Sequence, residues 1–215
     1  DGETLEAKVV IISTGAHHRK LDVPGEDKFA NRGVSYCATC DGPFFAGLDI
    51  FVVGGGDSAL EEALYLTKYG KSVTIIHRRD EFRASQIVVD KIKDNEKIKL
   101  VLDSVVNEIK GEKDATSLIV ENVKTHEISE LKSDDNSPIG VFIFIGYIPQ
   151  TDIFSGQLDM DYGYIKTDED MKTNIEGVFA VGDTRVKSVR QMVTAAGDGC
   201  IAAVMANRYL EGQAW

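Results

Sequence analysis

The stretch Asp49-Ile-Phe-Val-Val-Gly-Gly-Gly-Asp-Ser-Ala59 decides the fold of this chain. Its first residues form a short apolar run that indicates a buried strand, and its glycines indicate a turn. An amphipathic helix is expected over residues 60–69, closed by Gly70, and a second apolar strand over residues 72–76. The pattern therefore predicts a βαβ unit, which is the building block of an α/β fold with a parallel sheet.

Within this unit, Gly54-x-Gly56-x-x-Ala59 forms a glycine-rich loop between strand and helix. In a dinucleotide site of this type, the first glycine allows the tight turn and the second lets the pyrophosphate approach the backbone. The small third residue allows close packing of the helix. The helix N-terminus, where Asp57 and Ser58 lie, then faces the phosphates. The loop predicts a Rossmann-like nucleotide-binding domain; a glycine turn without a ligand is the alternative.

The residues after the second strand indicate which nucleotide binds. An NAD site would place an acidic side chain there for the ribose 2′-hydroxyl. This sequence instead has His77-Arg78-Arg79, with Arg83 one turn further on. Guanidinium groups bind phosphate bidentately and stay charged, so the arginines favour the 2′-phosphate of NADP. A solvated basic loop is the alternative, and His77 alone is compatible with a packing or capping role.

The spacing in Cys37-Ala-Thr-Cys40 indicates either a thiol/disulfide couple or half of a zinc site. A zinc site needs more ligands, but the only other cysteine is Cys200 and the four histidines lack H-x3-5-H spacing. Two buried structural cysteines are a further alternative. The spacing favours the redox couple, in which one thiolate attacks a partner disulfide and the second resolves the mixed disulfide. No metal site is expected.

Two neighbouring features add to this picture. Asp41 follows the second cysteine directly, and a carboxyl group there is a candidate general acid for a sulfur. Asp41-Gly42-Pro43 is equally a turn signal. Cys200, in the last expected helix, is predicted to be a packed small residue rather than a third redox thiol.

The composition is that of a globular protein of one or two domains, with 215 residues of which 43% are hydrophobic and 27% charged. With 24 basic and 35 acidic residues, the net charge of −11 argues against nucleic acid as a partner, and no basic tract suits a membrane surface. The sequence contains neither an apolar run of membrane-spanning length nor a signal-peptide pattern. Three cysteines, two of them in C-x-x-C, fit a reducing compartment, so a cytoplasmic location is expected.

Further strands are expected on both sides of the βαβ unit. Residues 7–15 form an apolar run that indicates a buried strand ending on a glycine turn. Residues 97–146 are rich in β-forming segments typical of a meander that returns to an apolar strand at 141–145. The chain is completed by short strands at 163–166 and 177–182 and a long helix over about 191–210.

Taken in order, these motifs resemble one family: the bacterial-type, low-molecular-weight NADPH-dependent thioredoxin reductases, which are FAD flavoproteins. The resemblance covers essentially the whole chain. The dithiol before the glycine loop and the arginines after it separate this family from the NADH-dependent alkyl hydroperoxide reductase flavoproteins, which share the dithiol but differ at the arginines. The matching residues are Ser13-Thr-Gly15, Cys37-Ala-Thr-Cys-Asp41, Gly54-Gly-Gly-Asp-Ser-Ala59, His77-Arg-Arg79, Arg83, Gly182-Asp183 and Arg190-Gln191.

The resemblance implies a route for electrons. NADPH would reduce FAD, FAD would reduce a Cys37–Cys40 disulfide, and the dithiol would reduce thioredoxin. Cys40 would be the sulfur nearer the flavin, Cys37 the one that attacks thioredoxin, and Asp41 the proton donor. A homodimer is implied for the complete protein. The residues implied to meet the flavin are Thr14 and Gly15 at its cleft, Gly182 and Asp183 at the ribityl and phosphate groups, and Arg190, Gln191 and Met192 near the ring.

The resemblance also implies the domain organisation of this α/β chain. A Rossmann-like NADP-binding domain at 16–145, with a parallel sheet plus β-meander and the redox C-x-x-C, is inserted into an FAD-binding domain made of 1–15 and 146–215. That FAD-binding domain is incomplete, because the family's N-terminal glycine-rich fingerprint has no counterpart here. The two flanking pieces are therefore expected to expose core surface. Two alternatives stay open: an NADP-binding fragment without flavin turnover, and a flavin-dependent reductase of another small disulfide protein of the peroxiredoxin-system type.

Overall fold

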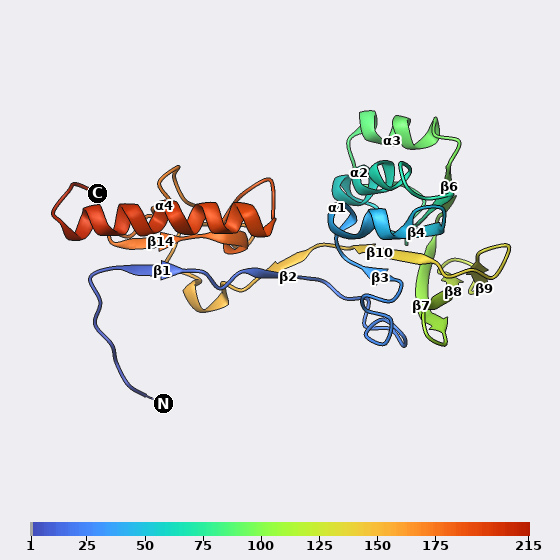
Figure 1. The fold of residues 1–215 in the computed structure, drawn as a ribbon, viewed down its shortest axis with the longest axis horizontal. Helices are drawn as coiled ribbons and strands as arrows, with labels where there is room; N and C mark the ends of the chain where they lie inside the picture. The colour runs from blue at the N-terminus through green and yellow to red at the C-terminus, as the bar shows by residue number, and fades with distance from the viewer. Residues whose placement is uncertain (1) are drawn as a thin grey trace. The chain divides into compact units, whose positions relative to one another are not determined.

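The computed structural model describes residues 2–215, which divide into two compact units (Figure 1). The inserted unit comprises His18–Gly146, and the split unit comprises the residues up to His17 together with Tyr147–Trp215. Strands β2 (Ala16–His18) and β11 (Tyr147–Pro149) lie where the chain passes from one unit to the other, and they pair with each other. The assignment of the inserted unit to NADP and of the split unit to FAD stays a prediction.

A five-stranded sheet forms the centre of the inserted unit (Figure 1). Its strand order is β3-β10-β4-β5-β6, and each neighbouring pair is parallel. The predicted α/β class with a Rossmann-like parallel sheet is therefore confirmed. The strands are β3 (Val34–Ser35), β4 (Asp49–Gly54), β5 (Ser72–Ile76), β6 (Ile98–Val101) and β10 (Gly140–Phe144).

The side chains of β4 alternate between the two faces of this sheet, as the two-residue period of a strand requires. Ile50 and Val52 belong to a core shared with the helices, whereas Phe51 and Val53 belong to a core shared with the β-meander. Figure 1 shows the helices and β7 on opposite sides of the sheet. Because both faces are covered, the central strands are continuous apolar runs. The helices are α2 (Asp57–Leu66) and α3 (Gln86–Lys93).

The predicted meander is confirmed as an antiparallel three-stranded sheet of order β7-β8-β9. Its buried residues Val106, Ile109, Leu118 and Val120 pack against the parallel sheet. Helix α3, by contrast, is not predicted from the sequence. The meander strands are β7 (Ser104–Gly111), β8 (Ala115–Asn122) and β9 (Ile128–Lys132).

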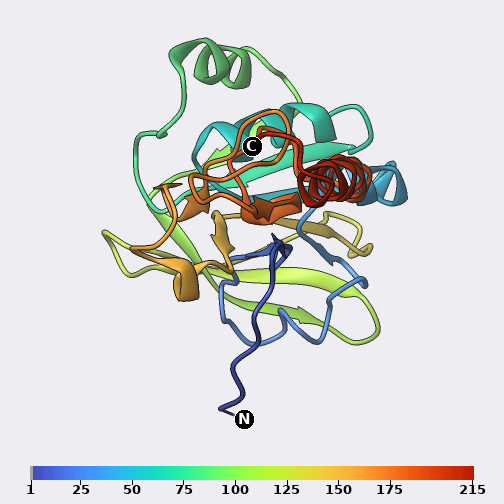
Figure 2. The ribbon, with the colours of Figure 1, turned by 90° about the vertical axis from the view of Figure 1, so that its left-hand side faces the viewer.

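The split unit is built around strand β1 (Val10–Ile12), which pairs in parallel with β14 (Val178–Ala180). Helix α4 (Met192–Leu210), seen along its axis in Figure 2, packs Ala202 and Ala206 against a core that contains Phe179. The long helix predicted over about 191–210 is confirmed. The remaining elements are the 3-10 helices η2 (Asp152–Phe154) and η3 (Gly182–Thr184) and the hairpin of β12 (Met160–Asp161) and β13 (Tyr164–Ile165).

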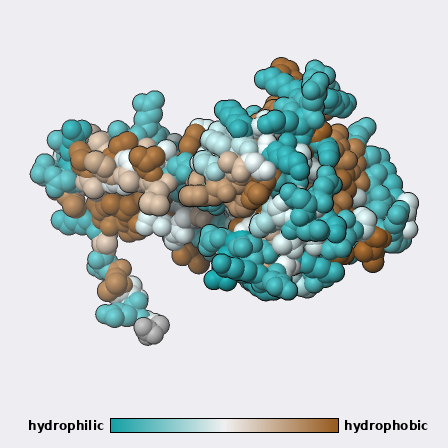
Figure 3. All heavy atoms as spheres, turned by 45° about the vertical axis from the view of Figure 1, so that its right-hand side comes forward, coloured by the Kyte–Doolittle hydropathy of each residue, from teal (hydrophilic) through white to brown (hydrophobic). Residues whose placement is uncertain are grey.

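Part of the split unit's apolar surface is exposed, as expected for the flanking pieces (Figure 3). Val10 and Ile11 of β1 are 45% and 41% exposed, so the prediction that this strand is buried is wrong for the described chain. Cys200 is also exposed, and its predicted packing is wrong. The reason is its place on α4: the buried positions Ala202 and Ala206 define one face, and Cys200 lies outside it.

Among residues 2–215, no helix combines the length and the apolar character needed to cross a membrane.

The backbone of Gly54 provides a test of how tightly the sheet and helix α2 approach each other. Its φ is +152°, and an added Cβ would lie 2.4 Å from the Phe144 carbonyl oxygen and 2.7 Å from the Ala59 Cβ. We expect Gly54→Ala to lower the free energy of unfolding by about 3 kcal/mol, through backbone strain and overpacking together. Urea unfolding followed by circular dichroism measures this loss.

The matched control is Gly47→Ala, because Gly47 also has a positive φ, +79°, but nothing lies within 4 Å of its added Cβ. Backbone strain alone then predicts a loss of about 1 kcal/mol. Equal losses in the two variants would contradict the close approach at Gly54.

Candidate functional site

The two cysteines of the C-x-x-C motif form a disulfide at helix α1 (Ala38–Asp41), with their Cα atoms 5.3 Å apart. Cys37 is the N-cap residue of this helix, and its Sγ accepts a hydrogen bond from the Cys40 backbone N at 3.2 Å. Ala38 is fully buried in the core beneath helix α2. Cys40 is exposed, which rules out the alternative of two buried structural cysteines. The disulfide is the oxidised state that the redox alternative requires, and no cluster of three or more metal-binding side chains occurs in residues 2–215.

Asp41 is the last residue of α1 and is held by a buried serine. Its Oδ2 accepts a hydrogen bond from the Ser35 hydroxyl at 2.7 Å, and Ser35 is 4% exposed. The turn alternative for this segment is also confirmed, because a 3-10 helix, η1 (Gly42–Phe45), begins directly after Asp41. Asp41 therefore combines a turn position with a fixed carboxylate beside the disulfide.

The glycine loop has the geometry that its motif predicts. Gly54 ends β4 at a positive φ and leaves room for Ala59, which is 1% exposed. Gly56 is the N-cap residue of α2, and the nearest atom to its added Cβ is the Arg83 carbonyl oxygen, at 3.8 Å. Asp57 and Ser58 are exposed in the first turn of α2. The loop thus presents open backbone at a helix N-terminus, which is the arrangement that binds phosphate.

Two hydrogen bonds tie the arginine segment to this loop. The Arg83 backbone N donates to the Gly55 carbonyl at 2.7 Å, and the Ser85 N donates to Asp57 Oδ1 at 2.8 Å. The side chains of Arg78, Arg79 and Arg83 belong to exposed residues. The arginines predicted to bind the 2′-phosphate are therefore held next to the loop predicted to bind the pyrophosphate. The link between Asp57 and Ser85 has no signal in the sequence.

His77 lies beneath the glycine loop rather than on the surface. It is 8% exposed, and an added Cβ on Gly55 would lie only 2.2 Å from its ring, so the ring fills the space that this glycine leaves. Its Nε2 is 3.2 Å from the Glu81 carbonyl oxygen. Burial lowers the pKa of His77, and the nearby arginines lower it further. This position favours the packing alternative for His77.

The residues predicted to meet a flavin lie on three adjoining elements of the split unit. Thr14 and Gly15 follow β1, Gly182 and Asp183 follow β14 in η3, and Arg190, Gln191 and Met192 lead into α4. Because β1 and β14 are parallel, their carboxyl ends meet at one edge. The Thr14 and Thr184 hydroxyls, 3.1 Å apart, join the two strand ends. Gln191 caps α4 in a capping box with Thr194.

Two buried polar atoms among these residues lack a hydrogen-bond partner within the described chain: Asp183 Oδ1 and Arg190 Nε. Buried polar groups are ordinarily satisfied, so an acceptor and a donor left over at one edge suit a polar ligand. The Arg190 guanidinium carbon lies 4.2 Å from the centre of the Tyr164 ring, which holds the arginine in place. These residues fit a flavin, whose ribityl hydroxyls and ring can both donate and accept hydrogen bonds.

Asp198 of α4, which is not among the predicted site residues, stabilises this edge through a hydrogen bond to its backbone. It is 7% exposed and accepts hydrogen bonds from the Gly182 N at 3.0 Å, Arg185 Nε at 2.8 Å and Lys187 Nζ at 2.8 Å. Burial by itself would raise the pKa of Asp198, but these donors outweigh it and lower the pKa to about 2. The carboxylate therefore fastens the turn that carries Asp183.

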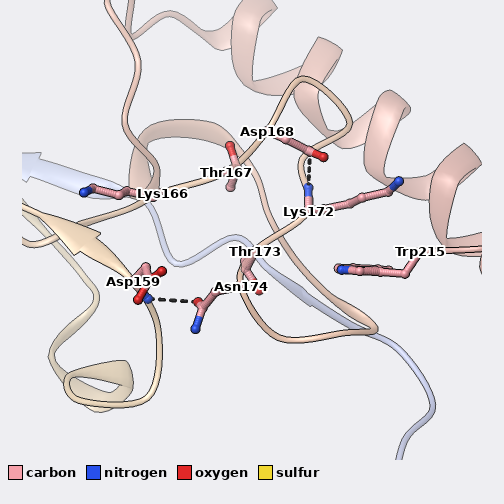
Figure 4. A pocket seen from close by; sticks show the side chains of 8 residues that line it. All are labelled: Asp159, Lys166, Thr167, Asp168, Lys172, Thr173, Asn174 and Trp215. Carbon is pink, nitrogen blue, oxygen red and sulfur yellow. Dashed lines mark hydrogen bonds between the residues drawn. The ribbon is translucent and has the colours of Figure 1, made fainter.

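The split unit also has a pocket of about 340 Å³, shown in Figure 4. None of the predicted site residues lines it. Its walls carry charges of both signs, and Lys172 lies above the Trp215 ring. The lining residues are Asp159, Lys166, Thr167, Asp168, Lys172, Thr173, Asn174 and Trp215.

Comparisons with known proteins agree with these features. The family model for pyridine nucleotide-disulphide oxidoreductases matches residues 1–199. The chain is 50% identical to a thioredoxin reductase of Peptoclostridium acidaminophilum, over 98% of this chain and 68% of that protein. It is similar to the solved thioredoxin reductase structures from Streptococcus pyogenes (47% identity, TM-score 0.88, covering 95% of this chain and 66% of that one) and Giardia duodenalis (41%, 0.87, 94% and 66%). The chain spans about two thirds of the length of these relatives.

The three donors to Asp198 predict a specific dependence of stability on pH. A carboxylate whose pKa falls from 3.8 to about 2 on folding stabilises the fold above pH 3.8, and the contribution is lost as the pH falls toward 2. We expect Asp198→Asn to lower the free energy of unfolding at pH 7 by about 2 kcal/mol and to flatten its decrease below pH 4. Denaturant unfolding at a series of pH values measures both effects.

Asp170→Asn is the matched control, because Asp170 pairs with Lys172 at 3.4 Å but is far more exposed. An exposed pair contributes roughly 0–1 kcal/mol. If Asp198→Asn behaves like this control, the buried network does not stabilise the turn.

Proposed function

Because the chain belongs to the thioredoxin reductase family of pyridine nucleotide-disulphide oxidoreductases, we propose that the full-length protein carries electrons from NADPH through FAD to the Cys37–Cys40 disulfide and on to thioredoxin. The observation that carries this proposal is the disulfide itself. It lies on the same unit as the glycine loop, and helix α1 packs in the same core as helix α2 of that loop.

NADPH is the proposed electron donor. The open backbone at Gly56 and the N-terminus of α2 suit a pyrophosphate, and the exposed arginines held beside the loop suit a 2′-phosphate. His77 would support the loop from beneath, because its ring fills the space that Gly55 leaves. FAD is the proposed carrier, and the unpartnered atoms of Asp183 and Arg190 support its contact with the split unit. When bound, FAD accepts electrons as hydride and passes them to a disulfide.

The proposed reaction at the dithiol has two stages: reduction of the enzyme disulfide, and then exchange with the thioredoxin disulfide. Reduction of the disulfide to two thiols takes two electrons and two protons. NADPH would supply both electrons and one proton as hydride, and solvent would supply the second proton. The Cys37 thiolate then attacks one sulfur of the thioredoxin disulfide, and the sulfur that leaves takes a proton. Cys40 attacks Cys37 in turn, which restores the enzyme disulfide and releases the second thioredoxin thiol. Asp41 would carry a proton to or from a sulfur in these steps.

The surface beside the disulfide supports a protein partner. Phe44, four residues after Cys40, is 81% exposed, so an apolar side chain close to the dithiol in the sequence is accessible to a protein partner. We propose thioredoxin as this partner because the chain belongs to the thioredoxin reductase family. The homodimer and the cytoplasmic location stay expectations that rest on the family resemblance and on cysteine usage.

The cysteine variants test the order of electron flow in the full-length, FAD-loaded protein. We expect Cys37→Ser and Cys40→Ser each to abolish thioredoxin reduction, because either thiol alone cannot complete the exchange. NADPH should still reduce the flavin in both variants, since hydride transfer to the flavin precedes reduction of the disulfide. Rapid-mixing spectra measure flavin reduction, and its loss in both variants would refute this order. Cys200→Ser is the control and should keep full turnover.

The arginines test the choice of nucleotide. We expect Arg78→Ala combined with Arg79→Ala to weaken NADPH binding by about 100-fold and NADH binding by less than about threefold, because only NADPH carries the 2′-phosphate. The ratio of the two KM values measures this preference. Arg32→Ala, an exposed arginine elsewhere on the inserted unit, should leave the ratio unchanged. Equal losses for the two nucleotides would remove the case for 2′-phosphate recognition.

A further inference from the structure

Ser35 connects the first cysteine to the acid of the candidate site. Its hydroxyl oxygen accepts a hydrogen bond from the Cys37 backbone N at 3.1 Å and lies 2.7 Å from Asp41 Oδ2. A serine hydroxyl has one proton to donate, and the carboxylate at 2.7 Å is a stronger acceptor than the Cys37 carbonyl at 3.4 Å. The hydroxyl therefore accepts from the dithiol loop and donates to Asp41.

The surroundings of Ser35 make this connection rigid. Ser35 belongs to β3 and pairs with Phe142 of β10 in the parallel sheet. It is 4% exposed, so water does not compete for its hydroxyl. Asp41, by contrast, ends a helix of only four residues, and a single turn fixes its backbone but not its carboxylate. The orientation of the Asp41 carboxylate thus depends on a side chain of the sheet.

We propose that Ser35 is the positioning residue for the proton donor of the dithiol. The Ser35 hydroxyl occupies Oδ2 by donating to it, which leaves Oδ1 to exchange a proton with a sulfur. The second bond, from the Cys37 N, fixes the acid relative to the cysteine whose sulfur reacts. This inference rests on the proposed role of Asp41 in the reductase reaction.

A double-mutant cycle tests the proposal in the full-length, FAD-loaded protein. The four forms are the wild type, Ser35→Ala, Asp41→Asn and the double variant. We expect Ser35→Ala to lower kcat for thioredoxin about tenfold and Asp41→Asn about 100-fold, with the KM for thioredoxin unchanged. Adding Ser35→Ala to Asp41→Asn should cause no further loss, because Ser35 acts through Asp41. Losses that multiply in the double variant would overturn the proposal.

A second readout does not need turnover. The reduced dithiol is alkylated with iodoacetamide from about pH 5 to about pH 10, which reports the thiolate fraction. Ser35→Ala should shift this pH profile in the wild-type background and leave it unchanged in the Asp41→Asn background. A shift of equal size in both backgrounds, or no shift in either, would contradict the proposal. Failure of wild-type turnover would instead contradict the proposed function, so the two failures are distinguishable.

Ser117→Ala is the matched control. Ser117 is a buried serine of the inserted unit, 5% exposed, and its hydroxyl donates to Glu130 at 2.6 Å, away from the dithiol. Its loss should lower thermal stability as much as the loss of Ser35 while the alkylation profile stays that of the wild type. An equal shift of the profile in Ser117→Ala would mean that a general loosening of the unit, not Asp41, is responsible.

Discussion

The close approach of backbone to backbone at Gly54 is the constraint on which the inserted unit depends. The Phe144 carbonyl at the end of β10 and the Ala59 Cβ in α2 occupy the space of any side chain at this position. The contact fixes the end of β4 against both elements. The next residue, Gly55, leaves room for the His77 ring and receives a hydrogen bond from Arg83. Two adjacent glycines therefore place the loop, the buried histidine and the arginine segment at the same carboxyl edge of the sheet, which is where nucleotides bind in such folds.

The dithiol depends on the same framework. Ala38, between the two cysteines, is buried in the core of α2, and Ser35 extends from an edge strand of the same sheet to hold Asp41. The chemistry of the disulfide and the proposed nucleotide site are thus supported by one set of packed elements. In the split unit, the buried Asp198 carboxylate likewise supports the candidate site, because its hydrogen bonds hold the turn that carries Gly182 and Asp183.

Local patterns in the sequence were sufficient for the elements with strong periodicity. The predicted ends of strand β5 are the observed ones, because the polar residues on either side of a β-branched run mark where the strand begins and ends. Helix α2 begins at Asp57, three residues before the predicted start, because apolar periodicity begins only inside the first turn. Helix α3 was missed because it is short, rich in β-branched residues and buries only Val88, Val89 and Ile92. Exposure of β1 agrees with the expectation for the flanking pieces, which rests on the family resemblance and not on the strand's own pattern. Exposure of Cys200 could not be foreseen, because a pattern identifies an apolar face without showing what covers it. The bridge from Ser35 to Asp41 is a contact that spacing alone does not encode.

The most direct test of the central claim is an anaerobic titration of the full-length, FAD-loaded protein with NADPH, followed by the visible flavin absorbance. If electrons pass from NADPH through the flavin to the Cys37–Cys40 disulfide, bleaching should require about two equivalents of NADPH per flavin, because flavin and disulfide each accept two electrons. The Cys40→Ser variant should need about one equivalent, because it has no disulfide to reduce. Complete bleaching of the wild type by one equivalent would show that the disulfide is not in the electron path, and would contradict the account.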